Sequence, residues 1–312
     1  MSLPDDYIRY PRRKYGIDND RYDWSILPRR DPVAWPGGAK IALWVVPVLE
    51  YFPLDSPREP FIPPGGMTTP YPDIRAYSLR DYGSRVGAFR VFKALDAQGI
   101  KATVAFNARI AQRYPFLMRE VTRRGWEVMA HGVDMGKLHH GELEIETERA
   151  LVRESVSVLR ALSGQDVRGW ASPARSESLN TLDLIAAEGI EYVADWVNDD
   201  MPYPMKTAAG EIHSMPHTHE ISDQHLILHM SHTEKEFTEQ VCDQFDTLYR
   251  EAATQGGRIM TLTIHPWCSG QPHRIKALEA ALAHIMGHDG VWSATGAEIL
   301  DAFRGNGDGD EG

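Results

Sequence analysis

Apolar and polar residues follow two different spacings in turn along most of the chain. Short apolar runs predict strands at residues 41–49, 101–106, 126–130, 168–171, 192–195, 226–229, 259–264 and 291–293. Apolar residues three or four positions apart predict helices at residues 83–98, 108–124, 144–163, 182–188, 233–256, 272–286 and from 295 onward. This alternation predicts an α/β fold with a mostly parallel sheet. About seven such units fit a closed, irregular (β/α) barrel better than an open sheet.

Three segments lie outside this alternation. Residues 1–39 have no clear period and predict an extended arm that lies on the barrel surface or on a neighbouring subunit. Residues 51–80 form a proline-rich loop insertion, which is typical of a lid or pocket wall, with an oligomer contact as the other interpretation. We expect one catalytic barrel domain over residues 40–303 and a disordered acidic tail over residues 304–312.

The composition narrows the function classes. The 312 residues carry a net charge of −11 and no basic run interleaved with aromatics, which argues against a nucleic-acid partner. No apolar run approaches the roughly 18–20 residues that span a bilayer, and the first residues lack a signal-peptide pattern. Two cysteines, Cys242 and Cys268, do not make a disulfide framework in a chain of this length. We expect a cytoplasmic protein that acts on a small molecule.

Polar residues come directly after three of the predicted strands. They are Glu50, His131 and His265, the last of which stands before a proline that ends its strand. The carboxyl ends of parallel strands meet at one edge of a sheet, where α/β proteins build their active sites. Most of the 13 histidines in this chain are expected to be surface or core residues, but this placement predicts a site for two of them.

Other polar residues have two interpretations each. Arg85 lies in the first turn of its predicted helix, where the helix dipole disfavours a cation, so it either binds a carboxylate or substrate or lies at the surface. Residues 217–220, with the sequence His-Thr-His-Glu, form either a second metal site or, as we favour, a polar rim. Cys268 is either the nucleophile of a cysteine amidohydrolase or, as we favour, a small buried hydrophobe.

Several stretches together resemble the NodB-homology, or polysaccharide deacetylase, superfamily. The stretches are residues 81–87, 125–132, 168–173, 195–203, 264–267 and 270–274. Within this carbohydrate esterase family 4-like group, the resemblance is to the branch that includes metal-independent allantoinases and cyclic imidases. It covers about residues 40–303 and implies a distorted (β/α) barrel with the active site at the carboxyl ends of the strands.

The resemblance also implies roles for individual residues. Arg168 matches an arginine that orients the catalytic base in deacetylases, and Asp195 is expected to pair with Arg168 or His265. The residues expected to contact substrate are Arg85, Arg168, Trp170, Trp196 and Trp267.

Two departures from the family pattern affect its metal site. Related deacetylases place two aspartates after the first strand, whereas this chain has Glu50 alone. They also bind metal through His-x-x-x-His, whose second histidine corresponds here to Met135, and a thioether is a poor zinc ligand. Glu50 and His131 remain as metal candidates, since His139 and His140 lie one turn too far along. We expect no cofactor, with one weakly bound zinc ion as the alternative.

These observations predict a hydrolase of carbon–nitrogen bonds other than peptide bonds that opens a small cyclic amide, imide or ureide. Glu50, together with His131, would activate water, and His265 would protonate the leaving nitrogen while Asp195 tunes the site. One alternative is a metal-dependent N-deacetylase of an acetylated sugar, and another is a non-catalytic ligand-binding barrel. Related proteins are commonly oligomeric, so we expect a homo-oligomer, with a tetramer favoured.

Overall fold

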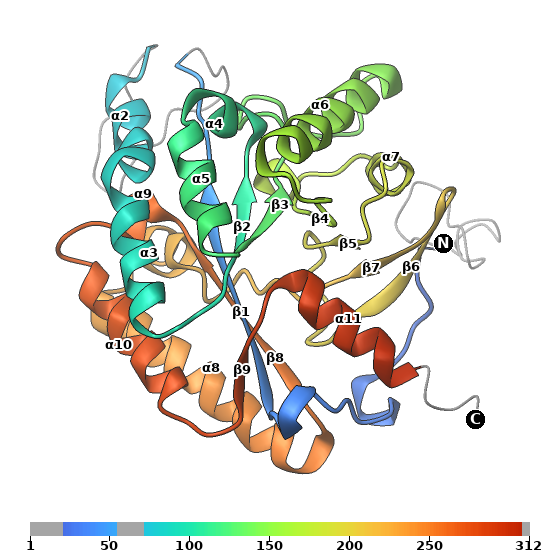
Figure 1. The fold of residues 1–312 in the computed structure, drawn as a ribbon, viewed down its shortest axis with the longest axis vertical. Coiled ribbons are helices and arrows are strands. Elements are labelled where there is room, and N and C mark those ends of the chain that lie inside the picture. Colours follow the sequence, from blue (N-terminus) through green and yellow to red (C-terminus); the bar gives the residue numbers. More distant parts are fainter. Residues whose placement is uncertain (1–20, 55–71, 308–312) are drawn as a thin grey trace, which may run out of the picture.

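The computed structural model describes residues 21–54 and 72–307 (Figure 1). The first 20 residues of the predicted arm, most of the proline-rich loop and residues 308–312 of the predicted tail lie outside the described residues. The last helix, α11, includes residues 304–307, so the predicted disordered tail does not begin at residue 304.

The strands form one curled, mostly parallel sheet at the centre of the molecule (Figure 1). They are β1 (Ile41–Leu49), β2 (Thr103–Phe106), β3 (Glu127–Ala130), β4 (Gly169–Trp170), β5 (Tyr192–Val193), β6 (Tyr203–Thr207), β7 (Gly210–Ser214), β8 (Arg258–Ile264) and β9 (Val291–Ser293). Their order is β6-β7-β5-β4-β3-β2-β1-β8, and β9 pairs with β1. Within the described residues β6 and β8 are not paired with each other, so the sheet forms a half-barrel rather than a closed ring. The predicted α/β fold with a distorted (β/α) barrel is confirmed, and the barrel is open between β6 and β8 rather than closed.

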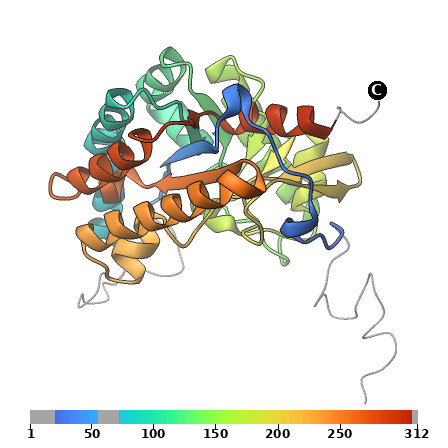
Figure 2. The same ribbon diagram turned by 90° about the horizontal axis from the view of Figure 1, so that it is seen from below.

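Helices cover the outside of the curled sheet. They are α2 (Ile74–Tyr82), α3 (Ala88–Ala97), α4 (Ala108–Arg113), α5 (Pro115–Arg123), α6 (Ile145–Ser163), α7 (Thr181–Ala187), α8 (Glu234–Gln255), α9 (Pro266–Ser269), α10 (Ile275–Met286) and α11 (Gly296–Gly307). Short 3-10 turns are η2 (Leu27–Arg29), η3 (Pro36–Gly38) and η5 (Pro173–Arg175), and π-helical turns are η4 (Gly83–Gly87) and η6 (Gln224–His229). Figure 2, seen from below, shows α8 lying along the strand β8.

One predicted strand is wrong. Residues 226–229 belong to the π-helical turn η6, because the Asp223 side chain accepts a hydrogen bond from the Gln224 backbone and starts a helical turn there. The hairpin β6–β7 was not predicted from the sequence. The turn between the two strands ends at Gly210, which has a φ of 121°. Glycine adopts this backbone angle without strain, whereas residues with a Cβ do not.

Strand β1 is buried on both faces. Ile41, Leu43 and Val45 belong to the larger buried cluster, on the side where α3 and α8 contact β1, whereas Ala42 and Trp44 belong to a second cluster with residues of β5 and α11. Burial of every residue from one end of the strand to the other is typical of the parallel sheets of α/β proteins. Every position of β1 is apolar because both faces of the strand are buried. Glu50 is the first residue after this strand.

The described part of the arm lies on the surface of the barrel. The Arg21 guanidinium is 2.7 Å from Oδ1 of Asp183, and that of Arg30 is 2.6 Å from Oδ2 of Asp199. The Trp35 indole donates a hydrogen bond to the Arg258 carbonyl, 3.0 Å away. Among the described helices, none combines the length and the apolar character that crossing a membrane requires.

Candidate active site

A cavity of about 220 Å³ lies at the carboxyl ends of the strands. The residues that line it come from the carboxyl ends of β1, β2, β3 and β8, from the loops after β4 and β7, and from the turn η6. The polar residues that line it are Glu50, His131, Ser172, Arg175, His217, His219, Ser222, Gln224, His229, Thr263 and His265. The geometry of the sheet thus brings together the three residues that follow predicted strands.

Glu50 and His131 face each other in this cavity. Oε1 of Glu50 lies 3.8 Å from Nε2 of His131, and the Trp267 indole donates to Oε2 of Glu50 over 3.3 Å. His131 donates from Nδ1 to the Ala171 carbonyl at 2.7 Å, so its Nε2 is the nitrogen turned toward Glu50. That Nε2 is buried and makes no hydrogen bond to the described residues. A gap of this length suits one water molecule that contacts both side chains.

The charges around Glu50 keep it ionised. Burial raises its pKa, but the His131 imidazole and the positive charges of His265 and Arg80 outweigh burial and lower the pKa below its ordinary value. Glu50 is therefore a carboxylate at neutral pH, as a base that accepts a proton from water must be.

His265 is held by a carboxylate that the sequence analysis missed. Its Nδ1 lies 2.7 Å from Oδ1 of Asp223, and its backbone N–H donates to Oδ2 of the same residue over 2.9 Å. The Ser269 backbone N–H donates to Asp223 as well, at 3.3 Å. Burial lowers the pKa of His265, but Asp223 and the charge of Glu50 outweigh burial and raise it. His265 can therefore carry a proton at neutral pH, with Nε2 as its remaining ring nitrogen.

Arg175 is the second site residue that the sequence analysis missed. It ends the turn η5 with a φ of 53°, after Ala174 with a φ of 56°, and this left-handed pair turns the chain toward the cavity. Its Nη1 atom is buried and makes no hydrogen bond to the described residues. Burial lowers the pKa of Arg175 and the charge of Asp195 opposes that effect, but a guanidinium stays protonated. Arg175 thus brings a positive charge to the cavity.

His217 has the interactions of a neutral, structural histidine. Its Nδ1 lies 3.0 Å from the Ala194 carbonyl and its Nε2 lies 2.7 Å from the Thr263 hydroxyl, so one ring nitrogen donates and the other accepts. Burial, together with the charge of Arg175, lowers its pKa well below the ordinary value. His217 therefore forms part of the cavity wall, and because it is neutral it does not act as a general acid at neutral pH.

Asp195 lies one layer behind the cavity lining. Its Oδ1 accepts a hydrogen bond from the Ser172 backbone over 2.7 Å. Burial raises its pKa, and burial together with the negative charge of Asp195 raises the pKa of Glu177 well above its ordinary value. The Trp196 indole donates to Glu177 over 3.2 Å. Asp195 therefore bonds to the Ser172 backbone and lies close to Glu177, and no pair with Arg168 or His265, the predicted partners, is present among the described residues.

None of the five predicted substrate contacts lines the cavity itself. Trp267 bonds to Glu50 and Trp196 to Glu177, whereas the other three make unrelated contacts. Arg168 precedes β4 and so lies at the opposite end of the sheet, where it forms ion pairs with Glu191 at 2.7 Å and Asp301 at 2.5 Å. Trp170 is fully buried in the core beside Ser172. The Arg85 side chain is 74% exposed and has Asp81 3.7 Å away. Arg168 cannot orient the base, because the length of the sheet separates the two.

The side chains around Glu50 and His131 do not fit a three-ligand zinc centre. Such a centre needs three protein donors about 2 Å from one ion. In the described part of the chain, the one group of three close His, Cys, Asp or Glu donor atoms lies elsewhere, on α8 and α10. His139 cannot complete the set, since its ring is buried 3.1 Å from Glu148. Burial raises the pKa of the Cys268 thiol, which argues against a thiolate nucleophile.

Comparisons with known proteins agree with the fold. Residues 70–193 match the family model described as polysaccharide deacetylase. A Schizosaccharomyces pombe protein classed with the polysaccharide deacetylases is 26% identical over 302 residues, which cover 88% of this chain and 93% of that protein. The structure of PuuE allantoinase superposes with a TM-score of 0.79 at 26% identity, covering 96% of this chain and 98% of that one. A Pseudomonas aeruginosa protein also classed as a polysaccharide deacetylase gives a TM-score of 0.78 at 28% identity, with 95% and 98% covered.

Proposed function

We propose that this chain, which is similar to the polysaccharide deacetylases and to PuuE allantoinase, is a hydrolase that opens a small cyclic amide, imide or ureide with water. The observation that carries this proposal is the grouping of an ionised Glu50, a protonatable His265 and the guanidinium of Arg175 around one small cavity. Amide hydrolysis needs a base, an acid and a positive group for the oxyanion, and these residues supply all three.

The base is Glu50. It accepts a proton from a water molecule held between its carboxylate and Nε2 of His131, and the hydroxide oxygen bonds to the ring carbonyl carbon. The carbonyl oxygen takes the negative charge of the tetrahedral intermediate. Arg175 lies on the cavity wall with a buried N–H, and we assign it to bind that oxygen.

The acid is His265. Asp223 holds Nδ1, so the proton on Nε2 passes to the leaving nitrogen as the carbon–nitrogen bond breaks. An imide or ureide nitrogen needs less help than an ordinary amide, since its electron pair is delocalised over a second carbonyl. The products are a carboxylic acid and an amide, or urea-type, group in one open chain. Solvent then takes the proton from Glu50 and returns one to His265.

The size of the cavity favours a small ring. Its volume of about 220 Å³ is below the range of about 300–1,000 Å³ that holds drug-sized ligands. A metal-dependent N-deacetylase of an acetylated sugar is the second candidate function, and the deacetylase classification of two relatives favours it. The incomplete donor set around Glu50 and His131 argues against that candidate.

One experiment separates the two functions. Enzyme stripped with a chelator would be assayed on succinimide and hydantoin for ring opening, and on acetylated glucosamine oligomers for acetate release. We expect ring opening at the same rate before and after chelation, and almost no acetate. Glu50→Gln, which keeps the side-chain size and removes the base, should be inactive in both preparations. Chelator-sensitive acetate release without ring opening would establish the deacetylase instead.

A further inference from the structure

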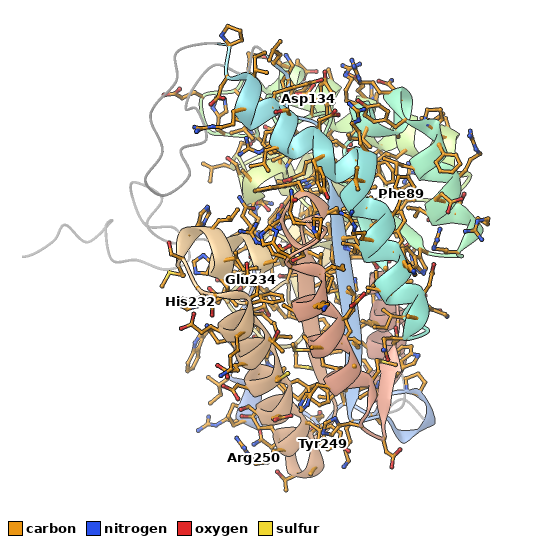
Figure 3. The ribbon with its side chains drawn as sticks, turned by 90° about the vertical axis from the view of Figure 1, so that its left-hand side faces the viewer. Phe89, Asp134, His232, Glu234, Tyr249 and Arg250 are labelled. Atoms are coloured by element: carbon orange, nitrogen blue, oxygen red, sulfur yellow. The ribbon has the colours of Figure 1, made fainter. Side chains whose placement is uncertain are left out.

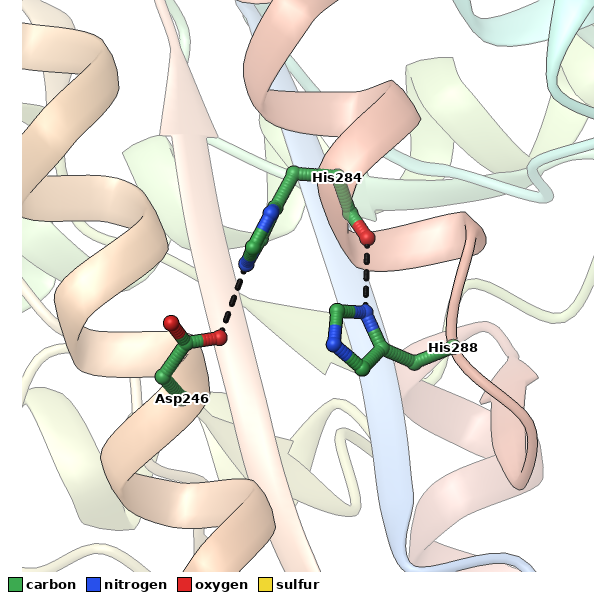
Figure 4. A group of neighbouring side chains, drawn as sticks. All are labelled: Asp246, His284 and His288. Carbon is green, nitrogen blue, oxygen red and sulfur yellow. Dashed lines mark hydrogen bonds and ion pairs between the residues drawn. The ribbon is translucent and has the colours of Figure 1, made fainter.

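A second group of ligand-type side chains lies on the outer face of the molecule, where α8 and α10 pack side by side (Figure 3). Asp246 comes from α8, His284 from α10 and His288 from the residues just after α10 (Figure 4). One donor atom from each lies within 4.8 Å of the others. We propose that these three residues bind one divalent transition-metal ion, with Zn²⁺ as the ion that suits them best.

The spacing of the two histidines suits a shared ion. His284 lies in the last turn of α10 and His288 lies two residues after its end, yet their ring centroids are only 4.9 Å apart. Asp246 completes the set from the facing helix. Two imidazoles and a carboxylate are donors that zinc accepts, at bonds of about 2.0–2.2 Å, with water as the fourth ligand. The side chain of Asp246 is 51% exposed and that of His284 is 35% exposed, so an ion and its water can enter from solvent.

Hydrogen bonds in the structure determine which ring nitrogen of each histidine would bind the metal ion. His288 donates from Nδ1 to the His284 carbonyl at 2.8 Å, so its Nε2 carries the free electron pair. A backbone carbonyl in this role orients the histidine ligands of zinc sites in general. His284 points Nε2 at Oδ1 of Asp246, 2.8 Å away. A metal ion would replace the proton of that hydrogen bond and draw His288 toward the same point.

Aromatic residues restrict the movement of the histidine rings. The ring centroid of His288 lies 4.9 Å from that of Phe245 and 5.2 Å from that of Tyr249, and His284 lies 5.8 Å from Phe245. The Tyr249 hydroxyl also donates to the Asp289 carbonyl at 2.9 Å, which ties the end of α10 to α8. The ligands therefore start near their bound positions, and ordering them costs little side-chain entropy.

A metal ion here would join the two helices without taking part in hydrolysis. None of the three ligands lines the cavity at the carboxyl ends of the strands. Binding to the folded state alone stabilises a protein by mass action, so zinc should raise the unfolding temperature.

The proposal is tested by titrating tag-free, chelator-treated protein with ZnCl₂ in a calorimeter. We expect one equivalent to bind, with affinity reduced about tenfold or more in His288→Gln and in Asp246→Asn. His273→Gln, an exposed histidine outside the group, should bind as the wild type does. His131→Gln should also leave this binding unchanged, which separates the new site from the cavity.

A second measurement guards against a folding defect. Zinc should raise the unfolding temperature of the wild type and of His273→Gln, and not that of His288→Gln, whose circular dichroism should match the wild type. Equal zinc affinity in the wild type, His288→Gln and Asp246→Asn would overturn the proposal. A loss of binding only in His131→Gln would overturn it too, since the ion would then belong to the cavity.

Discussion

The imidazole of His265 and the carboxylate of Asp223 lie 2.7 Å apart, although 42 residues separate them in the chain. Asp223 also accepts hydrogen bonds from the backbone of His265 and of Ser269, so it fixes both the ring and the loop that carries it. A carboxylate behind a catalytic imidazole sets its tautomer and raises the pKa of its protonated form. The pair explains how His265 can act as an acid in a buried site.

Replacing His265 with alanine should abolish turnover and leave the fold intact. General acids contribute on the order of 100- to 10,000-fold to a rate. The measurement is kcat for ring opening, with circular dichroism to show that the variant is folded. A variant that keeps more than half of the wild-type rate would show that His265 is structural.

Asp223→Asn should shift the pH profile of the enzyme. Asp223 raises the pKa of His265, and an acid works only while protonated, so the rate falls as pH rises through that pKa. Loss of the carboxylate lowers the pKa and moves this falling limb to lower pH. Glu234→Gln, a carboxylate that also lies near a histidine, His273, but outside the cavity, is the control and should keep the wild-type profile. An unshifted limb in Asp223→Asn would remove His265 from the role of acid.

Arg175→Met should lower kcat/KM by about 100- to 1,000-fold, the usual cost of losing one donor to an oxyanion. Arg85→Met is the matched control, because that arginine is largely exposed and lies outside the cavity. Its activity should stay within a factor of about two of the wild type. If Arg85→Met is the more damaging change, the substrate lies nearer η4 than this cavity.

Glu148→Ala should destabilise the protein by about 3–5 kcal/mol, because it leaves buried donors without their acceptor. The carboxylate accepts from His139 at 3.1 Å and from the Ser178 and Thr181 hydroxyls at 2.6 Å. Urea unfolding measures the change. Glu146→Ala, on the exposed side of the same helix, should change the free energy of unfolding by less than about 0.5 kcal/mol.

The same group predicts a pH dependence of stability. Burial raises the pKa of Glu148, but His139 and the two hydroxyls outweigh burial and lower it. A carboxyl group with a lowered folded-state pKa stabilises the protein above its unfolded pKa of about 4.3, and that stability is lost as pH falls through the folded-state pKa. Wild type should therefore lose more stability than Glu148→Gln between neutral and acidic pH, as urea unfolding would show. Equal losses in both proteins would contradict the assignment.

The protein should form a homo-oligomer, with a tetramer favoured. Light scattering at micromolar concentration would give a mass that is a multiple of the 35.1 kDa chain. A mass equal to one chain at that concentration would contradict this expectation.

The sequence predicted those parts of the site that depend on strand ends alone. Glu50, His131 and His265 each follow a buried strand, and parallel pairing brings strand ends together whatever the loops do. Asp223 and Arg175 were missed because they lie in turns, whose conformation depends on local hydrogen bonds and left-handed backbone angles.

In the fold, too, elements with a long apolar repeat were predicted well, and short elements without one were not. The helix at 144–163 was predicted within one residue, since its apolar spacing is long and Gly164 ends it in the left-handed conformation. The hairpin at 203–214 was missed because β6 buries a single residue, Met205, and β7 buries its last three residues in a row, so neither strand shows a clear alternation. The run at 226–229 was mistaken for a strand because four residues are too few to tell the two periods apart.

The place of β1 in the sheet has a consequence for synthesis of the chain on the ribosome. Ile41 pairs with Arg258, so the first strand waits for a partner that is made 217 residues later. Translation at about 5–20 residues per second makes that wait roughly 10 to 40 seconds long. During this time one edge of an entirely apolar strand stays open to other nascent chains. Aggregation during expression should therefore depend more on how fast residues 50–264 are translated than on the stability of the finished fold.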